Sequence, residues 1–298
     1  MHRDFERFEL ADYPKRLLEL KRPPKQLYVR GQLPKVLAFK NESAYLAGPR
    51  KPLVAIVGAR RASSLGQELA YNLARELATL GAVIISGGAL GIDAASHRGA
   101  LAAGGRTIVV LPSSIHQPLP RTNLALFEDV LLKGGALLSE YDHPPGGKFS
   151  FCARNRIVAA LCELLVVVEA KRRSGTSYTI KAAEGLGRIV CAVPWQITDE
   201  RGLGALKIFK QKKHPIGNAR DVFELLGIEY LQPSQARFNP SSDLEEFICE
   251  ILRKKGPLSS EELSEKTHYS IDSISQKLVQ MELKACLHRL NCGRYHLF

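Results

Sequence analysis

Short apolar runs recur through the middle of this 298-residue chain, and helical stretches separate them. The runs at 164–168 (Leu-Leu-Val-Val-Val) and 189–193 (Ile-Val-Cys-Ala-Val) are rich in β-branched residues and contain no polar side chain. Strands of this kind are typical of parallel sheets that helices cover on both faces. Together with earlier runs at 53–57, 83–85 and 107–111, they predict an α/β fold with a doubly wound, mostly parallel sheet across residues 51–228.

Three further segments flank this domain. Residues 1–50 mix prolines with basic residues and predict a small extension packed on the core, with an edge strand at 26–30. Residues 229–242 are rich in Pro, Ser and Gln and read as a linker. Residues 243–298 contain three amphipathic helical stretches and a terminal hairpin, which predicts a winged-helix-like domain.

The charge of the chain favours a polyanionic partner. Its net charge is +12, and the residues before 241 hold 34 Lys and Arg against 21 Asp and Glu. The six cysteines form no C-x-x-C pair, which indicates free thiols in a reducing cytoplasm and no metal site. No apolar run is long enough to span a membrane, so we expect no membrane contact.

Glycine-rich and basic turns follow the predicted strands, and in a parallel sheet such turns meet in one crevice. The first turn contains Gly58, Arg60 and Ser63, whose backbone N–H groups, hydroxyl and guanidinium suit an anion. The second contains Ser86, Gly87 and Gly91. Neither fits the P-loop pattern or a strict G-x-G-x-x-G pattern, so we expect no ATP hydrolysis and no dinucleotide cofactor.

Two later turns complete the predicted site. Phe151 offers a stacking face, Asn155 an amide that reads base edges, and Arg154 and Arg156 two phosphate clamps, just before an apolar helix. The last turn opens a helix and contributes a second phosphate cradle, made of Ser174, Gly175, Thr176 and Lys181.

Two titratable residues follow the second glycine-rich turn. Asp93 has three compatible roles, namely capping the next helix, binding a hydroxyl or orienting an arginine, and we favour capping. His97 has no nucleophile or metal ligand nearby in sequence, so we interpret it as a packing or hydrogen-bonding residue rather than a general base. We therefore expect no catalytic residue in this crevice.

These blocks, in this order, resemble the DNA-processing protein A family, also known as DprA or Smf. The resemblance extends from about residue 13 to 227, and its most specific parts are 57–60, 86–93 with His97, 154–159, and 169 with 174–175. It implies a Rossmann-like domain that binds single-stranded DNA without catalysing a reaction, forms a homodimer and helps to load the RecA recombinase during natural transformation.

The resemblance also implies residue roles. Arg60 would be the phosphate-binding arginine, residues 86–91 part of the pocket floor, and residues 151–156 the edge that grips the strand, while residues 174–176 would complete the cradle. Three positions depart from the family pattern: Cys152 replaces a proline, residues 113–116 replace a more glycine-rich turn, and Gly204 replaces an asparagine.

Two alternative functions remain open on the sequence. A related nucleotide phosphoribohydrolase would use a similar phosphate cradle, but its Pro-Gly-Gly-x-Gly-Thr signature is missing, since residues 145–148 read Pro-Gly-Gly-Lys without a following Gly-Thr. A regulatory nucleotide sensor is the other alternative. The C-terminal domain has nearly balanced charge and carries Asp272 on its candidate recognition helix, which argues against a grip on duplex DNA.

Overall fold

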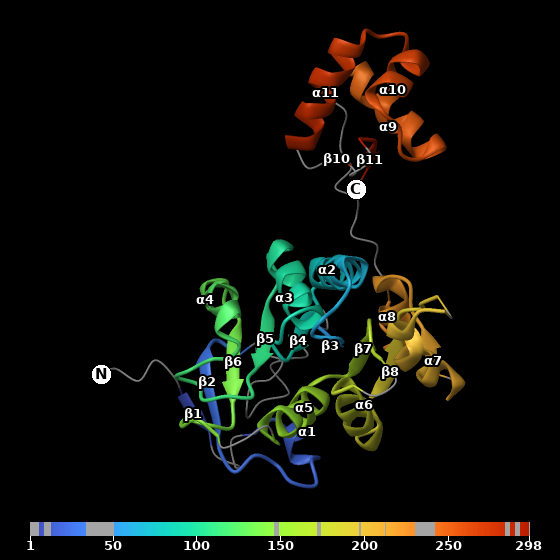
Figure 1. The fold of residues 1–298 in the computed structure, drawn as a ribbon. Helices are drawn as coiled ribbons and strands as arrows, with labels where there is room; N and C mark the ends of the chain where they lie inside the picture. Colours follow the sequence, from blue (N-terminus) through green and yellow to red (C-terminus); the bar gives the residue numbers. More distant parts are fainter. Residues whose placement is uncertain are drawn as a thin grey trace. The chain divides into compact units, whose positions relative to one another are not determined.

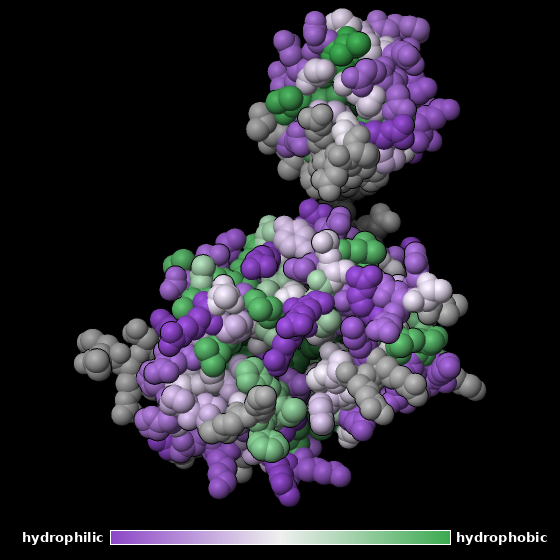
Figure 2. Space-filling model, viewed as in Figure 1, coloured by the Kyte–Doolittle hydropathy of each residue, from purple (hydrophilic) through white to green (hydrophobic). Residues whose placement is uncertain are grey.

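The computed structural model describes residues 6–8, 13–33, 51–145, 149–171, 174–196, 198–211, 213–229, 242–283, 287–289 and 293–297. The chain divides into two compact units, Met1–Tyr230 and Leu231–Phe298. Hydrophilic residues cover most of the visible surface of each unit, and hydrophobic ones form small scattered areas (Figure 2). Among the described helices, none has both the length and the hydropathy of a membrane-spanning segment.

A nine-stranded sheet forms the centre of the first unit, in the order β1-β2-β6-β5-β4-β3-β7-β8-β9 (Figure 1). Strands β3 to β9 run parallel, whereas β1 and β2 pair antiparallel at one side. The strands are β1 (Glu6–Phe8), β2 (Leu27–Gly31), β3 (Leu53–Val57), β4 (Val83–Ser86), β5 (Thr107–Val110), β6 (Ala136–Ser139), β7 (Leu164–Val167), β8 (Ile189–Ala192) and β9 (His214–Pro215). The predicted α/β fold with a mostly parallel sheet is confirmed.

The strand predicted at 26–30 is β2, but it is not at the edge of the sheet. It pairs with β6 on one side and with β1 on the other. The prediction was wrong on this point because β1 has only three residues, too few for an alternating pattern to be recognised. The N-terminal residues therefore contribute two strands to the main sheet.

Helices cover both faces of this sheet (Figure 1). On one face the side chains of α1, α5, α6 and α7 join the core cluster that contains Ala55 and Val57. On the other face α2, α3 and α8 pack over Val54 and Ile56, and α4 packs beside α3. The helices are α1 (Lys15–Leu18), α2 (Ser64–Thr79), α3 (Ile92–Ala102), α4 (Leu124–Leu132), α5 (Phe149–Leu161), α6 (Thr176–Gly185), α7 (Leu203–Lys210) and α8 (Ala219–Leu225), with 3₁₀ turns at Arg121–Asn123 and Glu200–Gly202.

The alternation along β3 explains why its sequence is apolar throughout. All five of its residues are buried, because odd-numbered side chains point to one helical layer and even-numbered ones to the other. The strand order reverses direction at β3: the next strand in the chain, β4, lies on one side of it, and the later strand β7 lies on the other. In open α/β sheets, ligands bind at the carboxyl ends of strands at this kind of switch point.

The second unit contains α9 (Asp243–Lys255), α10 (Ser260–Thr267) and α11 (Ile271–Leu283), with a hairpin of β10 (Leu287–Arg289) and β11 (Tyr295–Leu297). Ser259 and Glu262 form the capping box at the start of α10: each side chain accepts a hydrogen bond from the other residue's backbone N–H. Three helices and a hairpin agree with the predicted content, and the winged-helix assignment stays a prediction. Residues 230–241 of the predicted linker lie outside the described residues.

Phe127 offers a test of the packing between α4 and the sheet. Its side chain is buried among Val109, Val130 and Leu137, so Phe127→Ala is expected to lower the free energy of unfolding of the first unit by about 3–5 kcal/mol. Urea unfolding followed by the fluorescence of Trp195, the only tryptophan in the chain, measures this unit.

Leu132, on the same helix, is the matched control. Its side chain is 84% exposed, and Leu132→Ala is expected to change the free energy of unfolding by less than about 0.5 kcal/mol. Equal losses in the two variants would contradict this account of the core.

Candidate functional site

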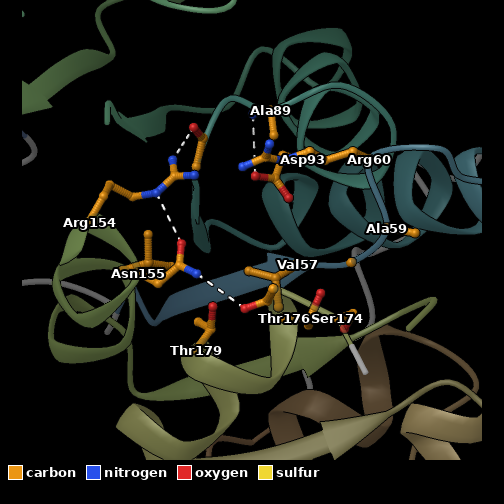
Figure 3. Close-up of a pocket in the computed structure, with 14 residues that line it drawn as sticks. Val57, Ala59, Arg60, Ala89, Asp93, Arg154, Asn155, Ser174, Thr176 and Thr179 are labelled. Atoms are coloured by element: carbon orange, nitrogen blue, oxygen red, sulfur yellow. Dashed lines mark hydrogen bonds between the residues drawn. The ribbon is translucent and has the colours of Figure 1, made fainter. Parts of the chain in front are cut away.

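A pocket of about 340 Å³ lies at the carboxyl ends of β4, β3 and β7, at the switch point of the sheet (Figure 3). It brings together residues from all four turns that the sequence singled out. Nine predicted site residues line it: Gly58, Arg60, Gly87, Asp93, Arg154, Asn155, Ser174, Gly175 and Thr176. Polar side chains from α3, α5 and α6 converge on the same space, so the crevice expected from the order of strands and turns is confirmed.

Arg60 is the exposed cation of this pocket. It lies in the turn between β3 and α2, and it forms no ion pair with any residue that the structure describes. The guanidinium carbon lies 4.6 Å from the centroid of the Phe151 ring, a cation–π contact that links this turn to α5. Arg60 is therefore oriented by an aromatic face while its N–H groups stay available to an anion.

The segment that carries Phe151, Arg154, Asn155 and Arg156 is not a turn before a helix. It lies inside α5, which begins at Phe149. The expectation was wrong because no glycine or proline interrupts residues 149–161, so the helix starts soon after the Pro-Gly-Gly sequence. Helical geometry then places Arg154, Asn155 and Val158 on the pocket side.

Arg156 lies on a different side of α5 and does not line the pocket. Its guanidinium donates a hydrogen bond to the Glu140 carboxylate at 2.5 Å. Burial raises the pKa of Glu140, and the charge and hydrogen bond of Arg156 oppose part of that rise. The structure therefore places Arg156 in an ion pair beyond the end of β6, and not among the groups that face the pocket.

Arg154 is buried rather than presented as an open clamp. Its side chain is 4% exposed, and its guanidinium donates to the carbonyl oxygens of Gly87 and Val110, at the ends of β4 and β5. A Cβ at Gly87 would lie 2.1 Å from this guanidinium, so any other residue there would displace the Arg154 side chain. Burial lowers the pKa of Arg154 to about 10, which still leaves it protonated at neutral pH. Arg154 thus braces the floor of the pocket.

Asn155 joins α5 to the fourth turn. Its Oδ1 accepts a hydrogen bond from Arg154 Nε at 3.2 Å, and its Nδ2 donates to the Gly175 carbonyl oxygen at 3.3 Å (Figure 3). Both ends of the amide are therefore engaged. The side chain connects the buried guanidinium to the turn that carries Ser174 and Thr176.

The capping role favoured for Asp93 is wrong. The N-cap position of α3 is Gly91, and Asp93 Oδ2 accepts instead from the backbone N–H of Ala89 at 3.3 Å. Burial raises the pKa of Asp93, and the nearby Arg154 charge acts in the opposite direction. This position contradicts the capping role, and the other two roles stay predictions.

Gly91 supports the pocket without lining it. Its φ is +76°, and a Cβ there would lie 2.3 Å from the Ala59 carbonyl oxygen. The two glycine-containing turns therefore approach each other too closely for a side chain. Ser86, predicted in the pocket floor, lies behind it, and its hydroxyl donates to the Ile56 carbonyl oxygen at 2.6 Å.

The N-terminus of α2 already holds a carboxylate of the chain. Ser63 is the N-cap residue, and both its backbone N–H and its hydroxyl donate to Glu169 Oε2, at 3.0 and 2.8 Å. Glu169 is 1% exposed, and a Cβ at Gly66 would lie 2.3 Å from the same oxygen. Ser63 is therefore committed to an internal contact and does not line the predicted anion site.

Sequence reasoning missed the roles of two residues in and near the pocket, Thr179 and Glu169. Thr179 lines the pocket one turn after Thr176, and this i, i+3 spacing on a predicted helix was the available signal. Glu169 belongs to the blocks that carry the family resemblance, but nothing in its sequence position indicated a partner 106 residues away. Among the described residues there is no group of three His, Cys, Asp or Glu side chains suited to a metal ion.

The positions that depart from the family pattern lie in different surroundings. Cys152 is exposed on α5, and Ser113, Ser114 and His116 line a neighbouring cavity of about 270 Å³ that also includes Phe151. A Cβ at Gly204 would lie 2.6 Å from the Ala170 carbonyl oxygen, so an asparagine does not fit there without a local shift.

Comparison with known proteins places the chain in a family. The family model described as DNA recombination-mediator protein A matches residues 5–227. The chain belongs to this family. A DNA processing protein DprA from Bacillus subtilis is 38% identical over 206 residues, which cover 67% of the chain and 68% of that relative. A putative DNA processing protein DprA from Mycobacterium tuberculosis is 35% identical. The match covers 70% of this chain but only about half (55%) of the length of that relative.

A solved structure extends the likeness to the fold of a DprA protein. A DNA processing protein A from Helicobacter pylori, described for its single-stranded DNA binding mode, is 31% identical with a TM-score of 0.62. The match covers 76% of the chain and 96% of that structure. The Rossmann-like fold of the chain is thus similar to that of this DprA protein.

His97 lies behind the pocket, and its predicted hydrogen-bonding role is confirmed. Its Nδ1 lies 2.7 Å from Thr107 Oγ1, which itself donates to the Ile84 carbonyl oxygen at 2.8 Å. The hydroxyl therefore accepts from His97, which fixes the neutral tautomer with its proton on Nδ1. Burial lowers the pKa of His97 to about 3, and the charges of Arg154 and Arg98 act in the same direction.

This shift predicts a pH dependence of stability. Between pH 6.5 and about 3 the unfolded chain binds a proton at His97 that the folded chain does not, so stability falls as the pH falls through this range. The contribution of His97 between pH 7 and pH 5 is about 2 kcal/mol. Urea unfolding at a series of pH values, followed by Trp195 fluorescence, measures the slope.

His97→Asn is expected to flatten that slope, because the amide does not titrate and still provides a hydrogen-bonding group near the Nδ1 position. His143→Asn is the control, since the His143 side chain is 90% exposed and should leave the slope unchanged. A wild-type slope in the His97→Asn protein would contradict the assignment.

Proposed function

We propose that the chain binds single-stranded DNA in the pocket at the carboxyl ends of β4, β3 and β7, without strong sequence preference. The observation that carries this proposal is Arg60, an exposed guanidinium oriented by Phe151 at the pocket. Charge-assisted hydrogen bonds from arginine are strong ligands for phosphate, and they carry no base specificity. The single-stranded DNA binding named for the Helicobacter pylori relative supports the same assignment.

The other groups of the pocket suit a sugar-phosphate chain. Thr176 supplies a hydroxyl from the first turn of α6 and Ser174 one from the turn before it, and residues 58–60 and 174–175 line the same pocket. The excess of basic residues before residue 241 adds a positive field that attracts a polyanion. These features support binding that weakens as salt concentration rises.

We further propose that the protein acts as a binder and not as an enzyme. Asp93 is engaged with the Ala89 backbone beside the Arg154 charge, and His97 is buried outside the pocket with Thr107 as its partner. His97 does not reach the pocket, and the Asp93 carboxylate, which lines it, already accepts a hydrogen bond beside the fixed Arg154 charge. The family assignment as a recombination mediator supports a role in loading the RecA recombinase during natural transformation, with a homodimer acting in the cytoplasm.

Arg60→Ala tests the proposed site. The substitution removes one phosphate contact, so affinity for a fluorescein-labelled dT20 strand is expected to fall about 10-fold or more. The slope of log Kobs against log salt concentration should become shallower by about 0.7, the value for one contact to a single strand. Fluorescence anisotropy over a salt series measures both quantities.

Arg106→Ala is the matched control. Arg106 is exposed and directly precedes β5, which places it at the opposite edge of the sheet from the pocket. Unchanged binding by the Arg60→Ala protein, or equal effects of both substitutions, would contradict the proposed site. Release of free base from nucleoside monophosphates would instead favour a phosphoribohydrolase.

A further inference from the structure

The aromatic ring expected to stack on DNA bases is already partly covered. Arg60 lies over one face of Phe151, with 4.6 Å between the guanidinium carbon and the ring centroid. Phe151 therefore orients the phosphate-binding cation, and that face of the ring is closed to a base. A ring that keeps a fully open face beside the pocket would have to come from another exposed residue.

Tyr178 meets this requirement. It lies in the first turn of α6, and its side chain is 59% exposed. Its backbone N–H donates to the Gly175 carbonyl oxygen at 3.1 Å, so the two residues are neighbours on one helical face. Side chains of a helix lean toward its N-terminus, which brings the ring toward the turn that lines the pocket.

The space beside Gly175 is open. A Cβ built there would find no other atom within 4 Å, although the residue itself lines the pocket. Thr176 and Thr179 face the pocket from the same helix, whereas Gly175 and Tyr178 are exposed. The first turn of α6 thus connects the interior of the pocket with an exposed aromatic ring.

Lys181 continues this face by another three residues. It is exposed, and no ion pair joins it to any other residue in the described part of the chain. It lines a smaller cavity of about 100 Å³ between α6 and α7, to which Lys207 also contributes. Lys181 was predicted among the phosphate-binding residues, and the structure places it outside the main pocket, one helical turn beyond Tyr178.

We propose that a single strand leaves the pocket along α6, with one base stacked on Tyr178 and an adjoining phosphate bound by Lys181. This inference rests on the proposed function and adds a path and an aromatic contact to it. Gly175, Tyr178 and Lys181 follow one another at i, i+3 and i+6, so a chain that leaves the pocket over Gly175 meets the ring before the ammonium group. Stacking tolerates any base, in keeping with weak sequence preference.

The two residues are expected to give different signatures in the salt series with dT20. Tyr178→Ala should weaken binding about 5- to 100-fold and leave the salt slope unchanged, because stacking releases no counterions. Tyr178→Phe should bind like the wild type, since it keeps the ring. Lys181→Ala should make the slope shallower by about 0.7.

Lys51→Ala is the charge-matched control, since Lys51 is exposed just before β3, at the opposite edge of the sheet. Wild-type affinity in Tyr178→Ala, or the same loss in Tyr178→Phe, would overturn the path along α6. Failure of the proposed function would show differently, as no single-strand binding by the wild type or as wild-type affinity in the Arg60→Ala protein. Failure of the path along α6 alone leaves the Arg60→Ala loss in place.

A cross-linking measurement locates the strand directly. A dT20 analogue with 5-iodouracil is irradiated with the wild-type protein, and the cross-linked peptide is identified by mass spectrometry. Attachment to the peptide that contains Tyr178 is the expected result, and it should be lost in Tyr178→Ala. Cross-links that map only outside α6 would overturn the inference.

Discussion

The pocket depends on a buried guanidinium that crosses the carboxyl edge of the sheet. Arg154 reaches from α5 to the carbonyl oxygens that end β4 and β5, with Asp93 on the opposite helical layer as its nearby negative charge. Removing a cation from water is costly unless its donors are satisfied, and here carbonyl oxygens and the Asn155 amide satisfy them. Once formed, this contact ties together two strand ends, α3, α5 and the turn at Gly175.

Supporting the pocket and binding a ligand are carried out by different residues, although the sequence suggested that Arg154 and Asn155 contact the ligand directly. Arg154 and Asn155 hold the turns in place, and Arg60 remains at the surface to meet a ligand. A site whose supporting side chains are already hydrogen-bonded loses little conformational entropy when a ligand arrives. The same contact accounts for the glycine at position 87, where a side chain would displace the Arg154 guanidinium.

Much of the fold was predictable, because buried parallel strands and helix caps leave local signals in the sequence. The three-residue β1 was not, since it is too short for a periodic pattern, and the start of α5 was placed too late even though a Pro-Gly-Gly break stands just before it. The convergence of the turns on one site was predictable, but the hydrogen-bond partners of its side chains were not. Arginine is seldom buried, and the carbonyl partners of Arg154 lie 67 and 44 residues away. The Glu140 partner of Arg156 likewise lies outside α5, just after β6.

The carboxylate of Glu169 at the start of α2 has a consequence for ligand choice. Proteins of this general architecture commonly seat a diphosphate on the helix that follows their first parallel strand, where the dipole is positive. In this chain the Glu169 carboxylate already occupies that position at the N-terminus of α2, and it would repel an incoming diphosphate. A small cofactor loses its main anchor under such conditions, whereas a long polymer, held weakly at many places, can do without it.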